Sequence, residues 1–304
     1  MIPVQNMNHR QLTRLFESGA TDTAIDEILF LTTQIQPTFH TAALQQLHQD
    51  ITRLFTGSYP GFQASNTRYH NLIHTCSVAL ATTRLLHGLA CSGREISIPV
   101  MELAIYSAYF HDAGLLRTAT DQARTGAVYT RNHEERSIAF MTQYLRGNNL
   151  PEFLSHHCPS VIHCTDLAQA PDDIAFPSPE ARLAGYVLGS ADILAQMADR
   201  YYLERLPFLF EEHRDGGLQT YHSAIELMQN TMSFYHNTII ERLDKAFAKI
   251  SDAMQVHFRE RWQINENLYY TNIAKNLDYL KTILDLCENR LECLETYLKR
   301  VPAP

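Results

Sequence analysis

The chain has 304 residues, of which 45% are hydrophobic and 19% charged, values typical of a globular protein with a sizeable core. Its formal net charge of −8 at pH 7 disfavours a general nucleic-acid binder, which needs a basic face to offset phosphate charge. It has no run of about 18 apolar residues and no basic-then-apolar amino end, so we expect neither a membrane span nor a secretory signal.

Apolar residues recur at three- and four-residue spacing along most of the chain, a pattern typical of helices. Alternating strand patterns are scarce, and Pro and Gly fall between the periodic segments. We therefore predict an all-α fold, with helices at 11–17, 23–31, 42–54, 78–89, 100–110, 138–145, 181–197 and 271–298.

The breaks between these helices are short. The strongest of them, Asp215-Gly216-Gly217, is too short for a domain linker, so we predict a single domain over 1–304. The tail carries a long apolar stripe, which serves either as core or as the seam of a homodimer. Its members are Leu268, Tyr269, Tyr270, Ile273, Leu277, Leu280, Ile283, Leu284 and Leu291.

The cysteines are scattered and contain no CxxC pair. An even count permits disulfides, but the absence of a secretory signal favours reduced thiols in a cytoplasmic protein. We expect them to act as small buried hydrophobes. The six are Cys76, Cys91, Cys158, Cys164, Cys287 and Cys293.

Five residues have the types and settings of a metal site. His70 and His74 are one helical turn apart and would share one face of a helix, with His74 at a loop-to-helix junction. His111 and Asp112 follow an apolar run and precede an Ala-Gly pair that lets backbone pass close to a site. Asp192 is flanked by apolar residues, an expensive setting for a carboxylate that is neither paired nor metal-bound. Such mixed nitrogen and oxygen ligands suit borderline-hard divalent ions.

The order of these residues resembles a family signature. His74, His111-Asp112 and Asp192 are similar to the H…HD…D signature of the HD-domain metal-dependent phosphohydrolases. The segment Tyr69-His70-Asn71-x-x-His74-x-x-x-Val78 also resembles the signature of class I cyclic-nucleotide phosphodiesterase catalytic domains. The resemblance implies an HD-type helical bundle at about 58–243, with N-terminal helices in 1–57 and C-terminal helices in 244–304 packed on it.

The resemblance implies roles for the five residues. His74, His111, Asp112 and Asp192 match the ligands of the tighter metal, and Asp112 matches the carboxylate that bridges to a second metal. His70 matches the histidine that protonates the leaving oxygen in the phosphodiesterases. Asp112 and His70 are thus the predicted catalytic residues.

Two further segments resemble stretches found in the same families. In Asn132-His133-Glu134-x-x-Ser137, His133 and Glu134 fall where other HD proteins place ligands of a second metal or groups that support them. In Ile162-His163-Cys164-Thr165-Asp166-Leu167, His163 is a further ligand candidate at a variable position. Asn71 and Thr165 match positions that support ligands without touching the metal.

The chain also departs from the animal phosphodiesterases. After His111-Asp112 it continues Ala113-Gly114 and lacks the histidine and Pro-Gly of their longer motif. Their purine-selecting glutamine precedes a phenylalanine by three positions, whereas here Gln229 precedes Phe234 by five. Gln229 and Phe234 are the matching substrate-binding candidates, with Gln229 as an ordinary helix-surface residue the open alternative.

The sequence therefore predicts a metal-dependent phosphohydrolase that acts on a nucleotide-like phosphoester, such as a cyclic nucleotide. We expect divalent metal ions as cofactors, two of them, with Mg, Mn, Zn and Fe all open. The partner would be a small-molecule phosphoester. The alternatives are a nucleotidase acting on a phosphomonoester and a catalytically silent regulatory protein that kept the fold.

Overall fold

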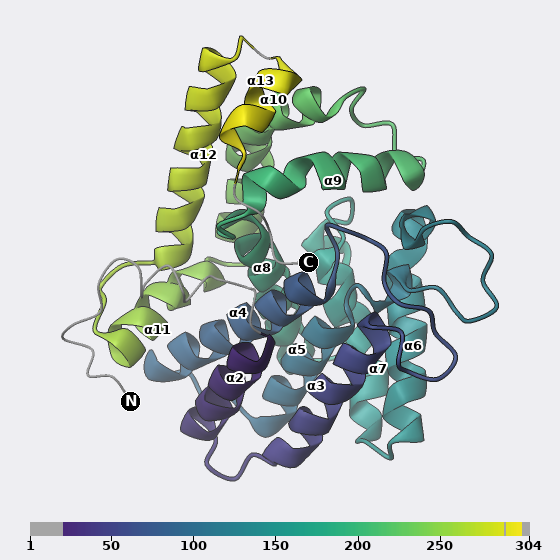
Figure 1. Ribbon diagram of the computed structural model, residues 1–304. Helices are drawn as coiled ribbons and strands as arrows, with labels where there is room; N and C mark the ends of the chain where they lie inside the picture. The colour runs from purple at the N-terminus through teal and green to yellow at the C-terminus, as the bar shows by residue number, and fades with distance from the viewer. Residues whose placement is uncertain (1–20, 289, 300–304) are drawn as a thin grey trace.

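The computed structural model describes residues 21–288 and 290–299, and within these ranges the chain is all α-helical (Figure 1). Twelve α-helices are joined by short 3-10 and π turns, and the described residues contain no β-strand. The predicted all-α fold is confirmed. The helix expected at 11–17 lies outside the described residues. None of the described helices combines the length and apolarity that a membrane crossing requires.

The described helices follow one another with short connections. In chain order they are α2 (Thr21–Ile35), α3 (Thr41–Phe55), α4 (Leu72–Cys91), α5 (Ile98–Phe110), α6 (His133–Gly147), α7 (Glu152–Ile162), α8 (Pro179–Met197), α9 (Tyr202–Asp215), α10 (Ala224–Phe234), α11 (Ala253–Trp262), α12 (Leu268–Leu286) and α13 (Leu291–Tyr297).

Helix α5 lies at the centre of the packing because nearly all of its surface is apolar. It contacts α3, α4, α7 and α8, and α4 in turn packs against α2, α8 and α11. In the view of Figure 1, α9, α10 and α12 with α13 stand above the body formed by α2 to α7. One continuous cluster of buried side chains extends from Ile28 in α2 to Leu294 in α13.

Side-chain caps set where five of the helices begin. Each capping oxygen accepts a hydrogen bond from the backbone N–H three residues later, which satisfies a donor that the helix leaves unpaired. The caps are Asn71 for α4, Ser97 for α5, Ser178 for α8, Ser223 for α10 and Asn267 for α12. The cap at Asn71 matters most for the site, because it fixes the first turn of α4.

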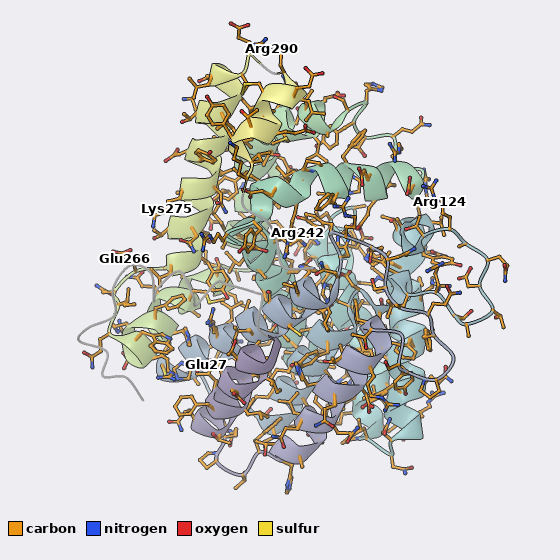
Figure 2. The ribbon with its side chains drawn as sticks, viewed as in Figure 1. Glu27, Arg124, Arg242, Glu266, Lys275 and Arg290 are labelled. Atoms are coloured by element: carbon orange, nitrogen blue, oxygen red, sulfur yellow. A yellow bond between two sulfur atoms is a disulfide. The ribbon has the colours of Figure 1, made fainter. Side chains whose placement is uncertain are left out.

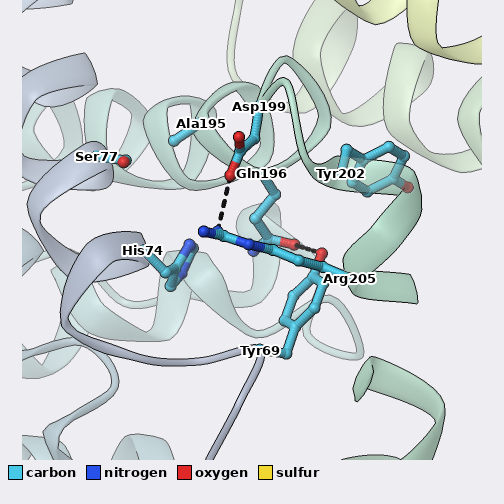
Figure 3. Close-up of a pocket in the computed structure, with 8 residues that line it drawn as sticks. All are labelled: Tyr69, His74, Ser77, Ala195, Gln196, Asp199, Tyr202 and Arg205. Atoms are coloured by element: carbon cyan, nitrogen blue, oxygen red, sulfur yellow. Dashed lines mark hydrogen bonds and ion pairs between the residues drawn. The ribbon is translucent and has the colours of Figure 1, made fainter. Parts of the chain in front are cut away.

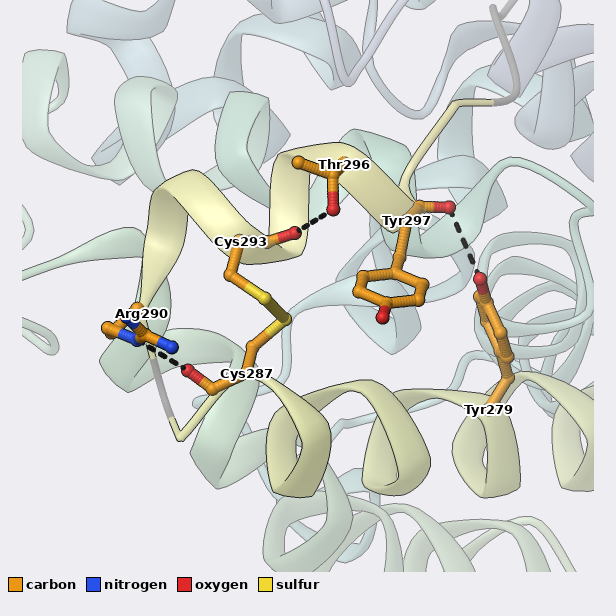
Figure 4. Close-up of a disulfide and its surroundings, with 6 residues drawn as sticks. All are labelled: Tyr279, Cys287, Arg290, Cys293, Thr296 and Tyr297. Atoms are coloured by element: carbon orange, nitrogen blue, oxygen red, sulfur yellow. Dashed lines mark hydrogen bonds between the residues drawn. A yellow bond between two sulfur atoms is a disulfide. The ribbon is translucent and has the colours of Figure 1, made fainter.

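The carboxyl end departs from the sequence prediction in two ways (Figure 4). The helix expected at 271–298 is broken, because α12 ends at Leu286 and Glu288 adopts a left-handed φ of 47° before α13 begins. The turn brings Cys287 and Cys293 to a Cα–Cα distance of 5.4 Å, within the range for disulfides, and they form one. The expectation of reduced thiols is therefore wrong for this pair. Cys91 is exposed rather than buried.

The apolar stripe of the tail is core in this structure. It faces α8, α9, α10 and α11, so its burial needs no second copy of the chain. Tyr270 is half-buried and Leu291 is 39% exposed. The buried members are Leu268, Tyr269, Ile273, Leu277, Leu280, Ile283 and Leu284.

Candidate metal centre and its cavity

Three helices bring four predicted ligands to one buried point. His74 lies in the first turn of α4, and His111 and Asp112 lie at the end of α5. Asp192 lies inside α8. All four side chains are buried, so their polar atoms depend on one another or on a bound cation rather than on water.

The donor atoms converge at short distances. His74 Nε2 lies 3.2 Å from His111 Nε2, and 3.3 Å from both Asp112 Oδ2 and Asp192 Oδ1. His111 Nε2 lies 3.2 Å from Asp112 Oδ2 and 3.7 Å from Asp192 Oδ1. Tetrahedral coordination at about 2.0–2.1 Å separates ligand nitrogens by about 3.3 Å. The group formed by His74, His111 and Asp112 could therefore hold a metal ion.

A backbone contact orients the imidazole of His111. His111 Nδ1 lies 2.8 Å from the carbonyl oxygen of Ala108 and donates to it, which leaves the Nε2 lone pair facing the other ligands. Ser137 of α6 donates to the carbonyl of His111 at 2.6 Å and accepts from the N–H of Gly114 at 2.8 Å. The turn that presents His111 and Asp112 is thus held from two sides.

The charges of this group act strongly on one another. Burial alone lowers the pKa of His111, but the carboxylates of Asp112 and Asp192 outweigh burial and raise it to about 9. Burial raises the pKa of Asp112, yet the charges of His111 and His70 bring it well below its usual range. Among the described residues, Asp112 Oδ2 accepts no hydrogen bond of good geometry although it is fully buried. A divalent cation with mixed nitrogen and oxygen ligands fits this donor set.

His133 and Glu134 lie beside the group, at the start of α6. His133 Nε2 is 3.6 Å from Asp112 Oδ1, and His133 Nδ1 lies 2.8 Å from the carbonyl of Thr130. Burial raises the pKa of Glu134 although the charge of His133 opposes it. A Cβ on Gly114 would lie 1.9 Å from the carbonyl oxygen of His133, so only glycine allows this approach. The predicted close backbone passage at Gly114 is present.

His70 does not share a helix with His74. Helix α4 begins at Leu72 with Asn71 as its cap, so His70 lies in the preceding loop and the predicted shared helix face is wrong. The two rings are still close, with centroids 5.7 Å apart. From this loop position, His70 directs its Nδ1 toward Glu212 of α9.

Glu212 binds the loop at two points. Its Oε2 accepts from His70 Nδ1 at 2.7 Å, and its Oε1 accepts from the backbone N–H of Tyr69 at 2.6 Å. Burial lowers the pKa of His70, but the charge of Asp112 and the hydrogen bond to Glu212 outweigh burial and raise it. Glu212 lies 142 positions from His70 along the chain and carries no local sequence signal, so it was not among the predicted site residues.

A second missed residue is Gln196, one turn after Asp192 on α8. It donates to Asp192 Oδ1 at 2.7 Å and accepts from Tyr69 Oη at 3.1 Å. Figure 3 shows it between Tyr69 and the ion pair of Arg205 with Asp199, whose atoms are 2.7 Å apart. Its i,i+4 spacing from Asp192 could have identified it.

His111, Asp112 and Asp192 line a cavity of about 520 Å³, and His74 contacts them from outside the lining. Among the described residues, the lining includes four acidic side chains, four histidines and no Lys or Arg. The rest of the lining is largely apolar and aromatic. Of the predicted substrate-binding residues, Phe234 belongs to the lining, whereas Gln229 is exposed on α10. His163 lies outside the lining, and its Nε2 is 3.4 Å from Glu135 Oε1.

A buried arginine supports the loop that carries Thr165, another lining residue. Arg242, labelled near the middle of the molecule in Figure 2, donates to the backbone carbonyls of Cys164 at 3.2 Å, Asp166 at 2.6 Å and Gln169 at 2.9 Å. These bonds satisfy carbonyls that the end of α7 and its following turn leave unpaired. The loop is therefore held by a side chain that lies outside the cavity lining.

No protein-family model matches the chain, and a search of curated proteins finds no significant match.

Proposed function

We propose that the protein is a metal-dependent phosphohydrolase of the HD-domain type, acting on a nucleotide-like phosphoester. One observation carries the proposal. Two buried imidazoles and two buried carboxylates meet in the order of the HD signature, and three of the four, His111, Asp112 and Asp192, line a cavity large enough for a nucleotide.

The first ion would be held by His74, His111, Asp112 and Asp192. Asp112 Oδ1 and His133, 3.6 Å apart, would contribute to a second. Bound there, divalent ions supply a hydroxide at neutral pH and offset charge on the phosphate oxygens. The carboxylates keep the site negative enough to retain cations, and the backbone bond of His111 keeps its Nε2 available as a ligand.

The chain supplies the proton for the leaving oxygen from His70. His70 lines the cavity, and its raised pKa favours the protonated form that a general acid needs. Glu212 fixes the ring by its bond to Nδ1, so that Nε2 is the nitrogen available to the substrate. Because the same carboxylate holds the backbone of Tyr69, ring and loop are positioned together.

The cavity favours a substrate with one phosphate and a flat apolar body. With no Lys or Arg among the described lining residues, only metal ions and histidines can offset phosphate charge. A triphosphate would bring additional negative charge that these lining residues cannot offset. Phe234 and Tyr221 offer aromatic surface on which a base could lie.

The test is hydrolysis of a substrate panel by chelator-treated protein, with and without added Mn²⁺ or Mg²⁺. The panel contains a 3′,5′-cyclic nucleotide, a nucleoside 5′-monophosphate and a nucleoside triphosphate. We expect metal-dependent hydrolysis of the cyclic nucleotide and least activity on the triphosphate. Asp112→Ala should abolish the activity, whereas Asp172→Ala, an exposed acid outside the cavity lining, should retain it.

Two results would overturn the assignment in different ways. Turnover of the monophosphate alone would make the protein a nucleotidase. Metal binding without hydrolysis of any phosphoester would make it a regulatory protein that uses the fold to bind a ligand.

A further inference from the structure

Gln196 lies between the candidate metal centre and the loop that precedes α4. It belongs to the last turn of α8, one turn after Asp192, and it lines the large cavity. Asn276 of α12 fixes this turn, because its amide donates to the backbone carbonyls of Met197 and Asp199, both at 2.9 Å. The backbone that carries Gln196 is therefore held independently of the contacts that its own side chain makes.

Each end of the Gln196 amide has a partner that suits it. Nε2 donates to Asp192 Oδ1 at 2.7 Å, and Oε1 accepts from the hydroxyl of Tyr69 at 3.1 Å, as Figure 3 shows for the second bond. A carboxylate only accepts hydrogen bonds, whereas a phenol is protonated at neutral pH and can donate. Turning the amide over would set its carbonyl oxygen against the carboxylate with no proton between them. The two partners therefore fix the orientation of the amide.

The oxygen of Asp192 that accepts from Gln196 also faces the proposed ligands. Oδ1 lies 3.3 Å from His74 Nε2 and 3.7 Å from His111 Nε2. A carboxylate oxygen has two lone pairs, so the bond from Gln196 leaves the second one for the side of the imidazoles. Carboxylates that bind metals in proteins are commonly held by such a neighbouring donor. Gln196 thus orients Asp192 without being a ligand itself.

Tyr69 extends this contact to the loop. Its hydroxyl donates to Gln196, while its backbone N–H donates to Glu212 Oε1 at 2.6 Å. Its ring is only 4% exposed, and the next residue, His70, is held by the other oxygen of Glu212. Helices α8 and α9 therefore hold the loop from two sides. On the side of α8, the residue that holds the loop is the one that orients Asp192.

We propose that Gln196 and Tyr69 are positioning residues, which link the carboxylate of Asp192 to the loop that carries His70. Both polar atoms of the Gln196 amide are engaged within the cavity wall at ordinary hydrogen-bond distances, so a substrate would have to compete for them. The role given to the loop rests on the proposed function, because it requires His70 to act on a substrate. The orientation of Asp192 rests on the metal centre alone.

Mn²⁺ titration of the chelator-treated, full-length protein tests the link without any substrate, with the electron paramagnetic resonance signal of free Mn²⁺ as the readout. Gln196→Met keeps the length of the side chain and removes both hydrogen bonds. We expect it to weaken binding of the tighter Mn²⁺ by about 10–100-fold, the usual effect of removing a group that supports a ligand. The control is Tyr144→Phe, which removes a buried hydroxyl 3.0 Å from the Asp50 carboxylate, outside the cavity lining. It should bind Mn²⁺ as the wild type does.

A double-mutant cycle with Tyr69→Phe distinguishes a link from two local effects. Tyr69→Phe keeps the ring and removes the donor, so it should weaken Mn²⁺ binding by less, about 2- to 12-fold, the range for one net hydrogen bond. In the Gln196→Met background the same change should add nothing, because the acceptor is already absent. Additive losses in the double variant, or wild-type affinity in Gln196→Met, would overturn the proposal.

Kinetics separate this inference from the proposed function and from direct substrate binding. At saturating Mn²⁺, Gln196→Met should keep the wild-type KM for a cyclic nucleotide. A raised KM at saturating Mn²⁺, with unchanged Mn²⁺ affinity, would make Gln196 a substrate contact and overturn the link. The predicted Mn²⁺ pattern without hydrolysis of any phosphoester would overturn the proposed function and leave Gln196 as the residue that orients Asp192. A wild-type protein that binds no Mn²⁺ would overturn both.

Discussion

Glu212 of α9 holds His70 by its ring nitrogen, with Glu212 Oε2 2.7 Å from His70 Nδ1. The same carboxylate accepts from the backbone N–H of Tyr69 at 2.6 Å. A helix far along the chain thereby fixes the orientation and the proton affinity of the proposed general acid.

Replacing Glu212 with Gln should move the alkaline limb of the pH–kcat profile to lower pH. His70 must be protonated to act as an acid, so activity falls as pH rises through its pKa. The hydrogen bond and charge of Glu212 raise that pKa, and their removal lowers it. The profile of Glu211→Gln, an exposed neighbour 3.8 Å from Arg68, should match wild type. An unmoved alkaline limb in Glu212→Gln would exclude this role.

His70→Ala should slow turnover of a nucleotide by about 10²–10⁴-fold, the usual contribution of proton transfer. Metal content should stay at the wild-type level, because His70 is not among the proposed ligands. The loss should be much smaller for a p-nitrophenyl phosphodiester, whose leaving group needs little protonation. Steady-state kinetics on both substrates, with metal analysis, provide the check. Equal losses on the two substrates would show that His70 does something other than donate a proton.

Gly114→Ala should lower both the free energy of unfolding and the turnover of a phosphoester. The added Cβ would meet the carbonyl oxygen of His133 at 1.9 Å, so α6 and the Asp112 turn must separate. Overpacking of this kind typically costs about 1–3 kcal/mol of unfolding free energy. Gly147→Ala is the matched control, since no described residue beyond its own helix turn has an atom within 4 Å of the added Cβ. Chemical denaturation and turnover of both variants test this, and a Gly114→Ala variant with wild-type stability would contradict the close packing.

Phe234→Ala should raise KM for a nucleotide with little effect on kcat. A ring stacked on a base contributes about 1–3 kcal/mol, or about 5- to 150-fold in affinity. Hydrolysis of a small artificial phosphodiester should be unaffected. Gln229→Ala, on the exposed face of the same helix, should leave both substrates unchanged. If Phe234→Ala harms both substrates equally or only lowers the Tm, the ring belongs to the core and not to substrate binding.

Helical periodicity made most of the fold predictable, and the misses have physical causes. Helices α7 and α9 carry internal prolines, Pro159 and Pro207, which in sequence normally indicate a break. The long C-terminal helix was predicted whole because its apolar spacing continues through the turn after Leu286. That turn depends on a left-handed residue, Glu288, and on a disulfide, neither of which periodicity reveals.

The candidate metal residues were predictable from their order along the chain, which resembles a known signature, and from their apolar settings. His74, His111, Asp112 and Asp192 do come together. Glu212 was not predictable, because only the packing of α9 brings it next to His70.

Metal content measured together with phosphoester hydrolysis in Asp112→Ala tests the central claim most directly. Wild-type and variant protein would be stripped with a chelator, reloaded with Mn²⁺ and analysed for bound metal at the candidate centre and for hydrolysis of a cyclic nucleotide. Because Asp112 is proposed both as a ligand and as the bridge between ions, the variant should lose bound metal and activity together. Wild-type metal content with wild-type turnover in Asp112→Ala would contradict the assignment.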